Sequence, residues 1–193
     1  MPASVPHDLE VQRRTPRDEG VENMLAATVE LLGQRRPEDI TVRDVAEASG
    51  HHHRFVQAWF GGKVGLFRAA FDRMSATTAA AITTQLGGEA ARTTQAIALA
   101  RLLNWLIAAD PDSLRGDRPT PVIDRVTEIY VRDLALDPEV ARLLAARAVG
   151  ATVSYLLFSD ILGIDADDVP RIAQLDREMV ALLAAARAGD QQD

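Results

Sequence analysis

The sequence predicts an all-α protein in which a small three-helix domain precedes a larger helical one. Apolar residues recur at three- and four-residue steps in segment after segment, and no stretch alternates at every second residue long enough to form a strand. Frequent Ala, Leu, Arg and Glu favour helix along the whole chain. With 193 residues, 47% of them hydrophobic, the chain is long enough to bury a full core.

Two short helices joined by a tight turn are predicted between Thr41 and Lys63. Thr41 supplies a hydroxyl N-cap to the first helix, and Ser49-Gly50 ends it because glycine accepts the left-handed backbone of a sharp stop. The positions at helical spacing are Val42, Val45 and Ala46 in the first helix and Val56, Trp59, Phe60 and Lys63 in the second. This arrangement is typical of a helix-turn-helix.

Three motifs around this region resemble the tetracycline-repressor (TetR) family of bacterial transcriptional regulators. They are MLAATVELL at Met24–Leu32, the segment ITVRDVAEASG, and WFGGKVGLF, and together they cover Met24–Phe67. The resemblance implies a DNA-binding head, a long connecting helix, and a helical domain for effector binding and dimerisation. The chain departs from the family pattern at Arg36 (usually Gly), His52 (a small hydroxyl residue), Gln57 (Tyr or a similar ring) and Gly61-Gly62 (Pro followed by Ser or Asn).

We expect a disordered tail at residues 1–17, a helix-turn-helix DNA-binding domain at 18–64, and a helical effector-binding and dimerisation domain at 65–193. Loops are expected at 34–39 and 110–118. The segment Thr94–Ala109 is apolar nearly all round, which predicts a buried helix. The other helices are expected at about 18–32, from Val64 to Gly87-Gly88, from Pro121 to about Leu134, from Pro138 to about Leu162, and from Val169 to Arg187.

Composition limits the functional classes. The formal net charge is −7, but the first 75 residues carry ten Lys/Arg and eleven Asp/Glu, so the acidity lies outside the predicted head. The absence of cysteine excludes disulfides and thiolate metal sites. No apolar run approaches the roughly 20 residues of a membrane helix. The first twenty residues contain no secretory signal, so we expect a soluble, cytoplasmic protein without membrane contacts.

The exposed face of the second short helix is expected to contact base edges in the major groove, while its flanks contact phosphates. Arg54 is the best candidate base reader, because its guanidinium can bond both acceptors of a guanine, and Gln57 can pair with adenine or bond a phosphate. The family pattern adds Thr41, Arg43 and Lys63 as phosphate contacts. In the alternative interpretation, Arg43 and Arg54 are solvated surface groups. The expected DNA-binding residues are Thr41, Arg43, His52, His53, Arg54, Phe55, Gln57, Ala58 and Lys63.

Three consecutive histidines, His51–His53, suggest a metal site at first sight. Consecutive residues do not face one another on a helix, and no acidic or cysteine partner stands at ligand spacing, so no metal is expected. His51 stands where the family has an apolar residue, and we expect it to pack inward. No phosphate-binding glycine loop or nucleophile arrangement is found, so neither catalysis nor a cofactor is expected.

An effector pocket is expected between the helix at 94–109, the helix at 120–134 and the start of the next one. Asn104 and Tyr130 would be its polar handles, because a buried amide needs a hydrogen-bond partner. The alternatives are a solvent-facing Asn104 and aromatic side chains that belong to the core. The expected pocket residues are Arg101, Asn104, Trp105, Val126 and Tyr130.

A two-fold homodimer is expected through the last two helices. Apolar residues at alternating three- and four-residue steps form a narrow seam in the final helix, and Gly150 in the preceding helix permits close helix approach. In the alternative, both stripes face the core of their own chain. The expected interface residues are Leu144, Ala148, Ala151, Tyr155, Ile172, Leu175, Met179 and Leu182.

These features predict a DNA-binding transcriptional regulator, a repressor that leaves a palindromic DNA operator when a small hydrophobic or amphipathic ligand binds. The alternative is a regulator-fold protein that has lost DNA binding and acts through protein contacts. His52, Gln57 and the neutral charge of the head favour that alternative. A small helical enzyme is a more distant option, for which the sequence offers no acid–base site.

Overall fold

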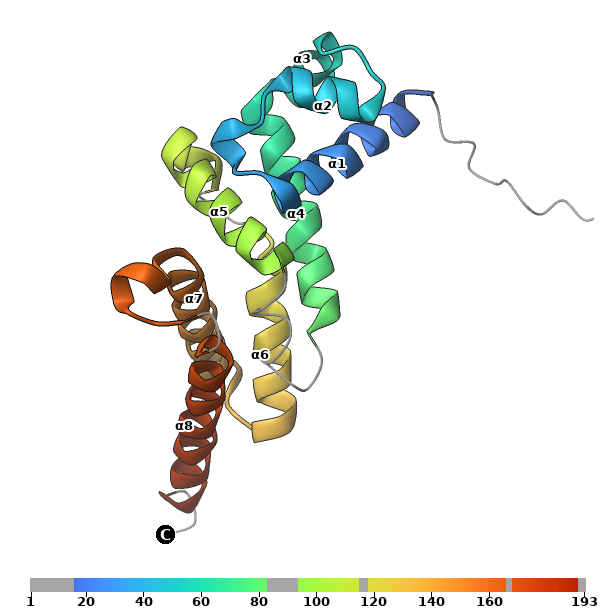
Figure 1. Ribbon diagram of the computed structural model, residues 1–193. Helices are drawn as coiled ribbons and strands as arrows, with labels where there is room; N and C mark the ends of the chain where they lie inside the picture. Colours follow the sequence, from blue (N-terminus) through green and yellow to red (C-terminus); the bar gives the residue numbers. More distant parts are fainter. Residues whose placement is uncertain (1–15, 83–93, 115–117, 166–167, 191–193) are drawn as a thin grey trace, which may run out of the picture.

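The computed structural model describes residues 16–82, 94–114, 118–165 and 168–190, which fold into α-helices and two short 3-10 helices without a strand (Figure 1). The predicted all-α class is confirmed. The helices α1 to α3 gather at one end of the molecule, α4 leads away from them, and α6 to α8 form the other end (Figure 1). The elements in chain order are α1 (Pro16–Gln34), η1 (Pro37–Asp39), α2 (Val42–Ser49), α3 (Arg54–Phe60), α4 (Lys63–Ala81), α5 (Thr94–Ala109), η2 (Pro111–Leu114), α6 (Pro121–Leu134), α7 (Pro138–Leu162) and α8 (Val169–Asp190).

Local signals begin and end the helices of the head, which we define as α1 to α3 with the first turn of α4. The backbone N–H of Asp44 donates to the Thr41 hydroxyl at 3.2 Å, and the Thr41 N–H donates to the Asp44 carboxylate at 2.5 Å. This pair is a capping box that starts α2. Gly50 and Gly61 follow α2 and α3 with φ of 70° and 72°, a left-handed conformation that ends each helix. The predicted cap at Thr41 and stop at Gly50 are confirmed.

The core of the head is completed by α5. Leu102 and Leu106 of α5 have no exposed surface and pack in one cluster with residues of α1 to α4. Burying a leucine side chain stabilises a fold by about 1.5–3 kcal/mol, so these two contacts are substantial. The helix α5 therefore contributes side chains to the core of the head, although it follows the head in the sequence. The buried residues that it meets there include Met24, Leu32, Ile40, Val45, Val56, Leu66 and Phe67.

A second core joins α6, α7 and α8 at the other end of the molecule. Ala141 and Ala145 of α7 are fully buried, so small side chains let α7 approach α6 closely. Val180 is the fully packed residue of α8 in this cluster. We call α5 to α8, with the second half of α4, the larger domain. The cluster consists of Ile82, Val126, Ile129, Tyr130, Leu136, Ala141, Ala145 and Val180.

The structure corrects several sequence-based boundaries. The first helix begins at Pro16, so Pro16 and Arg17 are helical and not part of a tail. Both predicted loops contain a 3-10 turn, η1 and η2. The helix α5 is not buried all round, because Ile107 is 52% exposed on its outer face. The predicted tail at 1–15 and the predicted continuation of α4 from residue 83 to Gly87-Gly88 lie outside the described residues.

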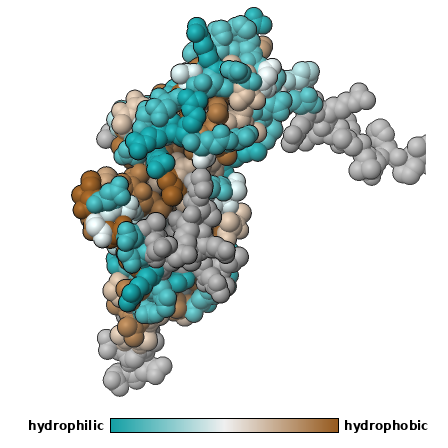
Figure 2. All heavy atoms as spheres, in the orientation of Figure 1, coloured by the Kyte–Doolittle hydropathy of each residue, from teal (hydrophilic) through white to brown (hydrophobic). Residues whose placement is uncertain are grey.

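The helix α7 differs most from its sequence-based description. By length and composition alone it is apolar enough to cross a membrane, contrary to the expectation that no segment is. Near its end the helix is kinked at Phe158, where φ is −123° and ψ is 16°. Hydrophobic residues gather on the surface around this end of α7 (Figure 2), where Ile161 is 83% exposed and Leu162 is 50% exposed. Apart from Ile107 of α5, the exposed large apolar side chains of the described residues lie on α7 and α8.

Candidate nucleic-acid interface and ligand cavity

The helix α3 presents one exposed polar face. Val56 is buried beneath the helix, while Trp59 and Phe60 are half-buried. His52, His53, Arg54, Gln57 and Ala58 are exposed together, and Phe55 stands half-buried at the edge, as the helical pattern predicts. A short helix with an exposed polar face and a buried apolar face, set after a turn, has the form of a major-groove reader.

A stack of rings fixes α3 on the head. Phe55 and Trp59 lie face to face with ring centres 4.4 Å apart and an interplanar angle of 12°. His51 meets the Trp59 ring edge-on at 5.9 Å, so it packs inward as expected. The edge of the Trp59 ring also contacts α1 so closely that a Cβ atom at Gly20 would lie 2.5 Å from the indole. Gly20 is therefore a positioning residue for α3 that the sequence pattern did not reveal.

Arg54 is held in a way that leaves its hydrogen-bond donors available. Its guanidinium carbon lies 5.0 Å from the centre of the Phe55 ring, and its side chain forms no ion pair with any residue in the described ranges. The Arg54 backbone N–H donates to Nδ1 of His52 at 3.2 Å, which ties the His52 ring to the start of α3. Arg43 is also exposed and forms no ion pair within the described part of the chain. Both arginines can therefore bond an external acceptor.

Two of the predicted phosphate contacts are engaged within the protein. The Thr41 hydroxyl is used in the capping box with Asp44. The Lys63 ammonium donates to the Pro37 carbonyl at 2.9 Å and lies 4.9 Å from the Phe67 ring centre and 5.0 Å from the Trp105 ring centre. Burial of this ammonium lowers the pKa of Lys63 below its ordinary value. Lys63 is thus an internal contact between the head and α5 in this structure.

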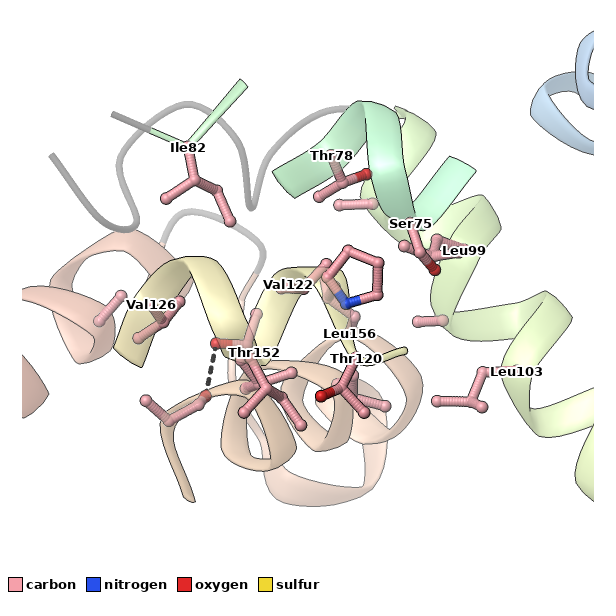
Figure 3. Close-up of a pocket in the computed structure, with 18 of the residues that line it drawn as sticks. Ser75, Thr78, Ile82, Leu99, Leu103, Thr120, Val122, Val126, Thr152 and Leu156 are labelled. Carbon is pink, nitrogen blue, oxygen red and sulfur yellow. Dashed lines mark hydrogen bonds between the residues drawn. The ribbon is translucent and has the colours of Figure 1, made fainter. Parts of the chain in front are cut away.

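A cavity of about 280 Å³ lies in the larger domain between α4, α5, α6, α7 and α8 (Figure 3). Its walls are mainly apolar, which is the usual character of a small-molecule site. Ser75 and Thr78 of α4 stand on one side, and Thr120, Thr152 and Leu156 stand across from them (Figure 3). The remaining apolar lining includes Phe71, Ile82, Leu99, Leu103, Val122, Ile123, Val126, Val149 and Val153.

The cavity includes some of the predicted pocket residues and excludes others. Val126 and Tyr130 line it. Arg101 and Asn104 are exposed on the outer face of α5, so Asn104 is not the buried polar handle that was predicted. Trp105 packs on Phe67 at 5.0 Å between ring centres and belongs to the core of the head. The error has one physical cause: α5 carries apolar residues on most of its faces, so the sequence pattern does not reveal which face lines the cavity.

The predicted dimer residues divide between the surface and the interior of the chain. Leu175, Met179 and Leu182 on α8 are 51%, 50% and 70% exposed. Leu144 packs against the core of the larger domain, and Ala148 lines the cavity, so these two contact their own chain. Ala151, Tyr155 and Ile172 are half-buried. Five further large apolar side chains in the described parts of α7 and α8 are exposed: Leu143, Phe158, Ile161, Leu162 and Leu183.

No group of three or more His, Cys, Asp or Glu side chains is arranged to hold a metal ion in the ranges that the structure describes. The rings of His52 and His53 lie side by side with centres 4.2 Å apart. They stand on the exposed face next to Arg54, away from the carboxylates that would complete a metal site. His52 and His53 are therefore part of the candidate nucleic-acid interface, whereas His51 packs inward.

Comparison with protein-family models finds no match, and comparison with curated proteins finds none. Among solved structures, a TetR-family transcriptional regulator from Streptomyces coelicolor superposes with a TM-score of 0.51 and 20% identity, over 91% of this chain and 85% of that one. The TetR-family repressor AlkX from Dietzia sp. strain DQ12-45-1b, implicated in biodegradation of n-alkanes, gives a TM-score of 0.48 and 21% identity, over 90% of this chain and 97% of that one. The chain, with its N-terminal helix-turn-helix and following helical domain, thus has the fold of the TetR family.

Proposed function

We propose that this protein is a DNA-binding transcriptional regulator, a repressor that leaves its operator when a small hydrophobic or amphipathic molecule binds. The observation that carries the proposal is the exposed face of α3, where Arg54 and Gln57 stand beside His52 and His53 on a helix fixed by stacked rings. Arginine and glutamine are side chains that can bond base edges in pairs. Rigid mounting of such a helix favours recognition, because less freedom is lost on binding.

Response to a ligand is supported by the two faces of α5. Leu99 and Leu103 line the cavity, while Leu102 and Leu106 are buried in the core of the head. A molecule that binds in the cavity and shifts α5 would therefore disturb the packing of the head. Such a molecule shifts the protein away from DNA only if it binds the DNA-incompetent arrangement more tightly.

Dimerisation is supported by the exposed apolar residues of α7 and α8. A large exposed apolar patch marks an interaction surface in most soluble proteins. Two copies that pair α7 and α8 across a two-fold axis would cover this surface in a four-helix bundle. The pair would then carry two α3 helices, which suits a palindromic operator, because one short helix reads few bases.

The second candidate is a regulator-fold protein that acts through protein contacts without binding DNA. Lys63 favours it, since the residue expected to bind phosphate is engaged with Pro37, Phe67 and Trp105. The formal charge of the chain, −7, also gives little general attraction to DNA. The exposed arginines at positions 43 and 54 favour the first candidate.

A mobility-shift titration with the DNA that flanks the protein's own gene separates the two candidates. We expect specific binding that weakens steeply with salt, because phosphate contacts release counterions. Arg54→Ala should cost about 1–3 kcal/mol of binding free energy and relax base preference. Arg101→Ala is the matched control, because it removes the same charge from the outer face of α5. Equal affinity for flanking and random DNA at moderate salt would reject DNA recognition and leave the second candidate.

A further inference from the structure

Two buried hydroxyl groups on the cavity wall have no hydrogen-bond partner within the part of the chain that the structure describes. Ser75 is 4% exposed and Tyr130 is 3% exposed, and both line the cavity. Neither hydroxyl bonds to any residue in the described ranges. Two other hydroxyls of the wall are satisfied, since Thr152 donates to the Ala148 carbonyl at 2.9 Å and Thr120 donates to Asp124 at 2.9 Å, whereas the hydroxyl of the half-buried Thr78 has no partner within the described ranges.

These two hydroxyls face the cavity. Among the described residues, every side-chain oxygen or nitrogen that is fully enclosed has a hydrogen-bond partner. The oxygens of Ser75 and Tyr130 have no partner among these residues, so they are not fully enclosed and keep some accessible surface. Because both side chains are otherwise buried and both line the cavity, the accessible surface of their oxygens borders the cavity. A buried hydroxyl that lacks a partner costs free energy, and a ligand oxygen that bonds to it removes that cost.

The charged residues around the cavity are confined to one of its walls. The charged residues in its wall are Asp176 and Arg177 of α8. Asp176 accepts from Arg147 at 2.8 Å, whereas the half-buried Arg177 beside it forms no ion pair within the described ranges, so the two charged residues of the wall stand together on α8. Burial raises the pKa of Tyr130, and the Asp176 carboxylate raises it further, so the phenol is a neutral donor at pH 7. An ion placed among the leucines and valines of the other walls would lose its hydration without a partner.

We propose that the cavity binds an uncharged, mainly apolar molecule that carries a hydroxyl or carbonyl oxygen hydrogen-bonded to Ser75 or Tyr130. This inference rests on the proposed function, in which the cavity is the effector site. The volume of about 280 Å³ holds roughly ten non-hydrogen atoms, taking about 30 Å³ for each water-sized group.

Ser75 also gives such a ligand a direct route to the head. It lies on α4, which begins at Lys63 directly after α3. A ligand oxygen held by Ser75 would contact the helix that joins the cavity to the DNA-reading helix. Tyr130 lies on α6, so a ligand bound to both hydroxyls would bridge α4 and α6. The same hydrogen bonds that select the ligand would then set the spacing of these two helices.

The test is calorimetric titration of the full chain with 1-nonanol, nonanoate and nonylammonium, in the absence of DNA. We expect 1-nonanol to bind with a Kd about tenfold or more below those of the two charged analogues. Ser75→Ala and Tyr130→Phe should each raise this Kd about three- to tenfold, the effect of one lost hydrogen bond. Thr77→Val and Ser154→Ala are matched controls, because these hydroxyls bond to backbone carbonyls of residues that do not line the cavity, and their loss should leave the Kd unchanged.

Thermal unfolding of the ligand-free variants gives a second readout. Because the two hydroxyls have no partner within the described ranges, Ser75→Ala and Tyr130→Phe should keep or raise Tm. Four outcomes would each overturn the inference. They are tighter binding of nonanoate than of 1-nonanol, an unchanged Kd for 1-nonanol in both variants, a large loss of Tm in the variants, and no binding of any of the three molecules. Since DNA binding is measured separately, a protein that recognises its operator but fails this test retains the proposed function and loses only the ligand class.

Discussion

The ammonium of Lys63 lies 5.0 Å from the centre of the Trp105 ring, so the first residue of α4 contacts a side chain of α5. The centre of the Phe67 ring lies 4.9 Å from the same ammonium, which donates a hydrogen bond to the Pro37 carbonyl at 2.9 Å. Cation–ring contacts of this kind contribute about 0.5–2 kcal/mol, depending on burial. The residue that the family pattern assigns to DNA thus joins the head to the helix that lines the cavity.

We expect Lys63→Met to act on stability more than on DNA contacts. The variant loses a charged hydrogen bond and two ring contacts, which should lower the free energy of unfolding by about 1–3 kcal/mol. Its DNA affinity should depend on salt as steeply as that of the wild type. Arg43→Met, which removes an exposed and unpaired charge, should reduce the slope of log affinity against log salt by about one. Chemical denaturation and salt titrations measure the two quantities.

The single lysine of the chain allows a direct check of this geometry. Lysine labelled with ¹³C at Cε gives one side-chain NMR signal, which the Phe67 and Trp105 rings should displace from its free-lysine position. Trp105→Leu should move the signal toward that position, and Ile107→Ala on the exposed face of α5 should not. A wild-type signal at the free-lysine position would show that Lys63 is released into solvent, and the phosphate role would then stand.

Gly20→Ala should destabilise the head through Trp59. The new Cβ atom would lie 2.5 Å from the indole, so the ring must move and disturb its stack with Phe55. We expect a loss of about 1–3 kcal/mol in unfolding free energy, as for other overpacked sites, together with weaker operator binding. Gly33→Ala in the same helix is the control, since no atom lies near its Cβ position and alanine favours helix. Equal stability of the two variants would show that Trp59 does not fix α3.

The sequence predicts the elements of this fold better than their contacts. Thr41 and Gly50 act through neighbouring backbone atoms, so the boundaries that they set could be predicted from local pattern. The roles of Leu102 and Leu103 could not, because one faces the head and the other the cavity, and both are leucines in an apolar segment. Lys63 carries no local sign that Trp105 will lie beside it, since that contact depends on how α5 returns to the head.

Acid should remove the contribution of the capping box at the start of α2. The hydrogen bonds from the Thr41 N–H and hydroxyl hold the pKa of Asp44 below its ordinary value, with help from Arg35 at 3.3 Å. A carboxylate with a depressed pKa stabilises the fold fully above the pKa of the unfolded chain, near 3.8, and loses this effect as pH falls through its folded value. The stability difference between wild type and Asp44→Asn should therefore shrink as pH falls below about 4.

Denaturant titrations between pH 2 and pH 7 measure this difference. Asp39→Asn serves as the charge control, because it removes the same charge next to the capping box without removing one of its hydrogen bonds. A gap between wild type and Asp44→Asn that stays constant down to pH 2 would mean that ionisation of Asp44 does not contribute to the cap.

Met179→Arg should separate the proposed dimer into monomers. Met179 is 50% exposed on α8, between Leu175 and Leu182, so an arginine there would place an unpaired charge in the proposed seam. An uncompensated buried charge costs about 3 kcal/mol or more, which raises the dissociation constant more than a hundredfold. Light scattering at micromolar concentration should therefore give half the wild-type mass, with an unchanged helical circular-dichroism spectrum. Gln174→Arg adds the same charge to the polar face of α8 and should stay dimeric.

A folded and dimeric Met179→Arg protein would place the interface elsewhere. A wild type that is monomeric in solution but sediments with lipid vesicles would assign the apolar face of α7 to a membrane instead.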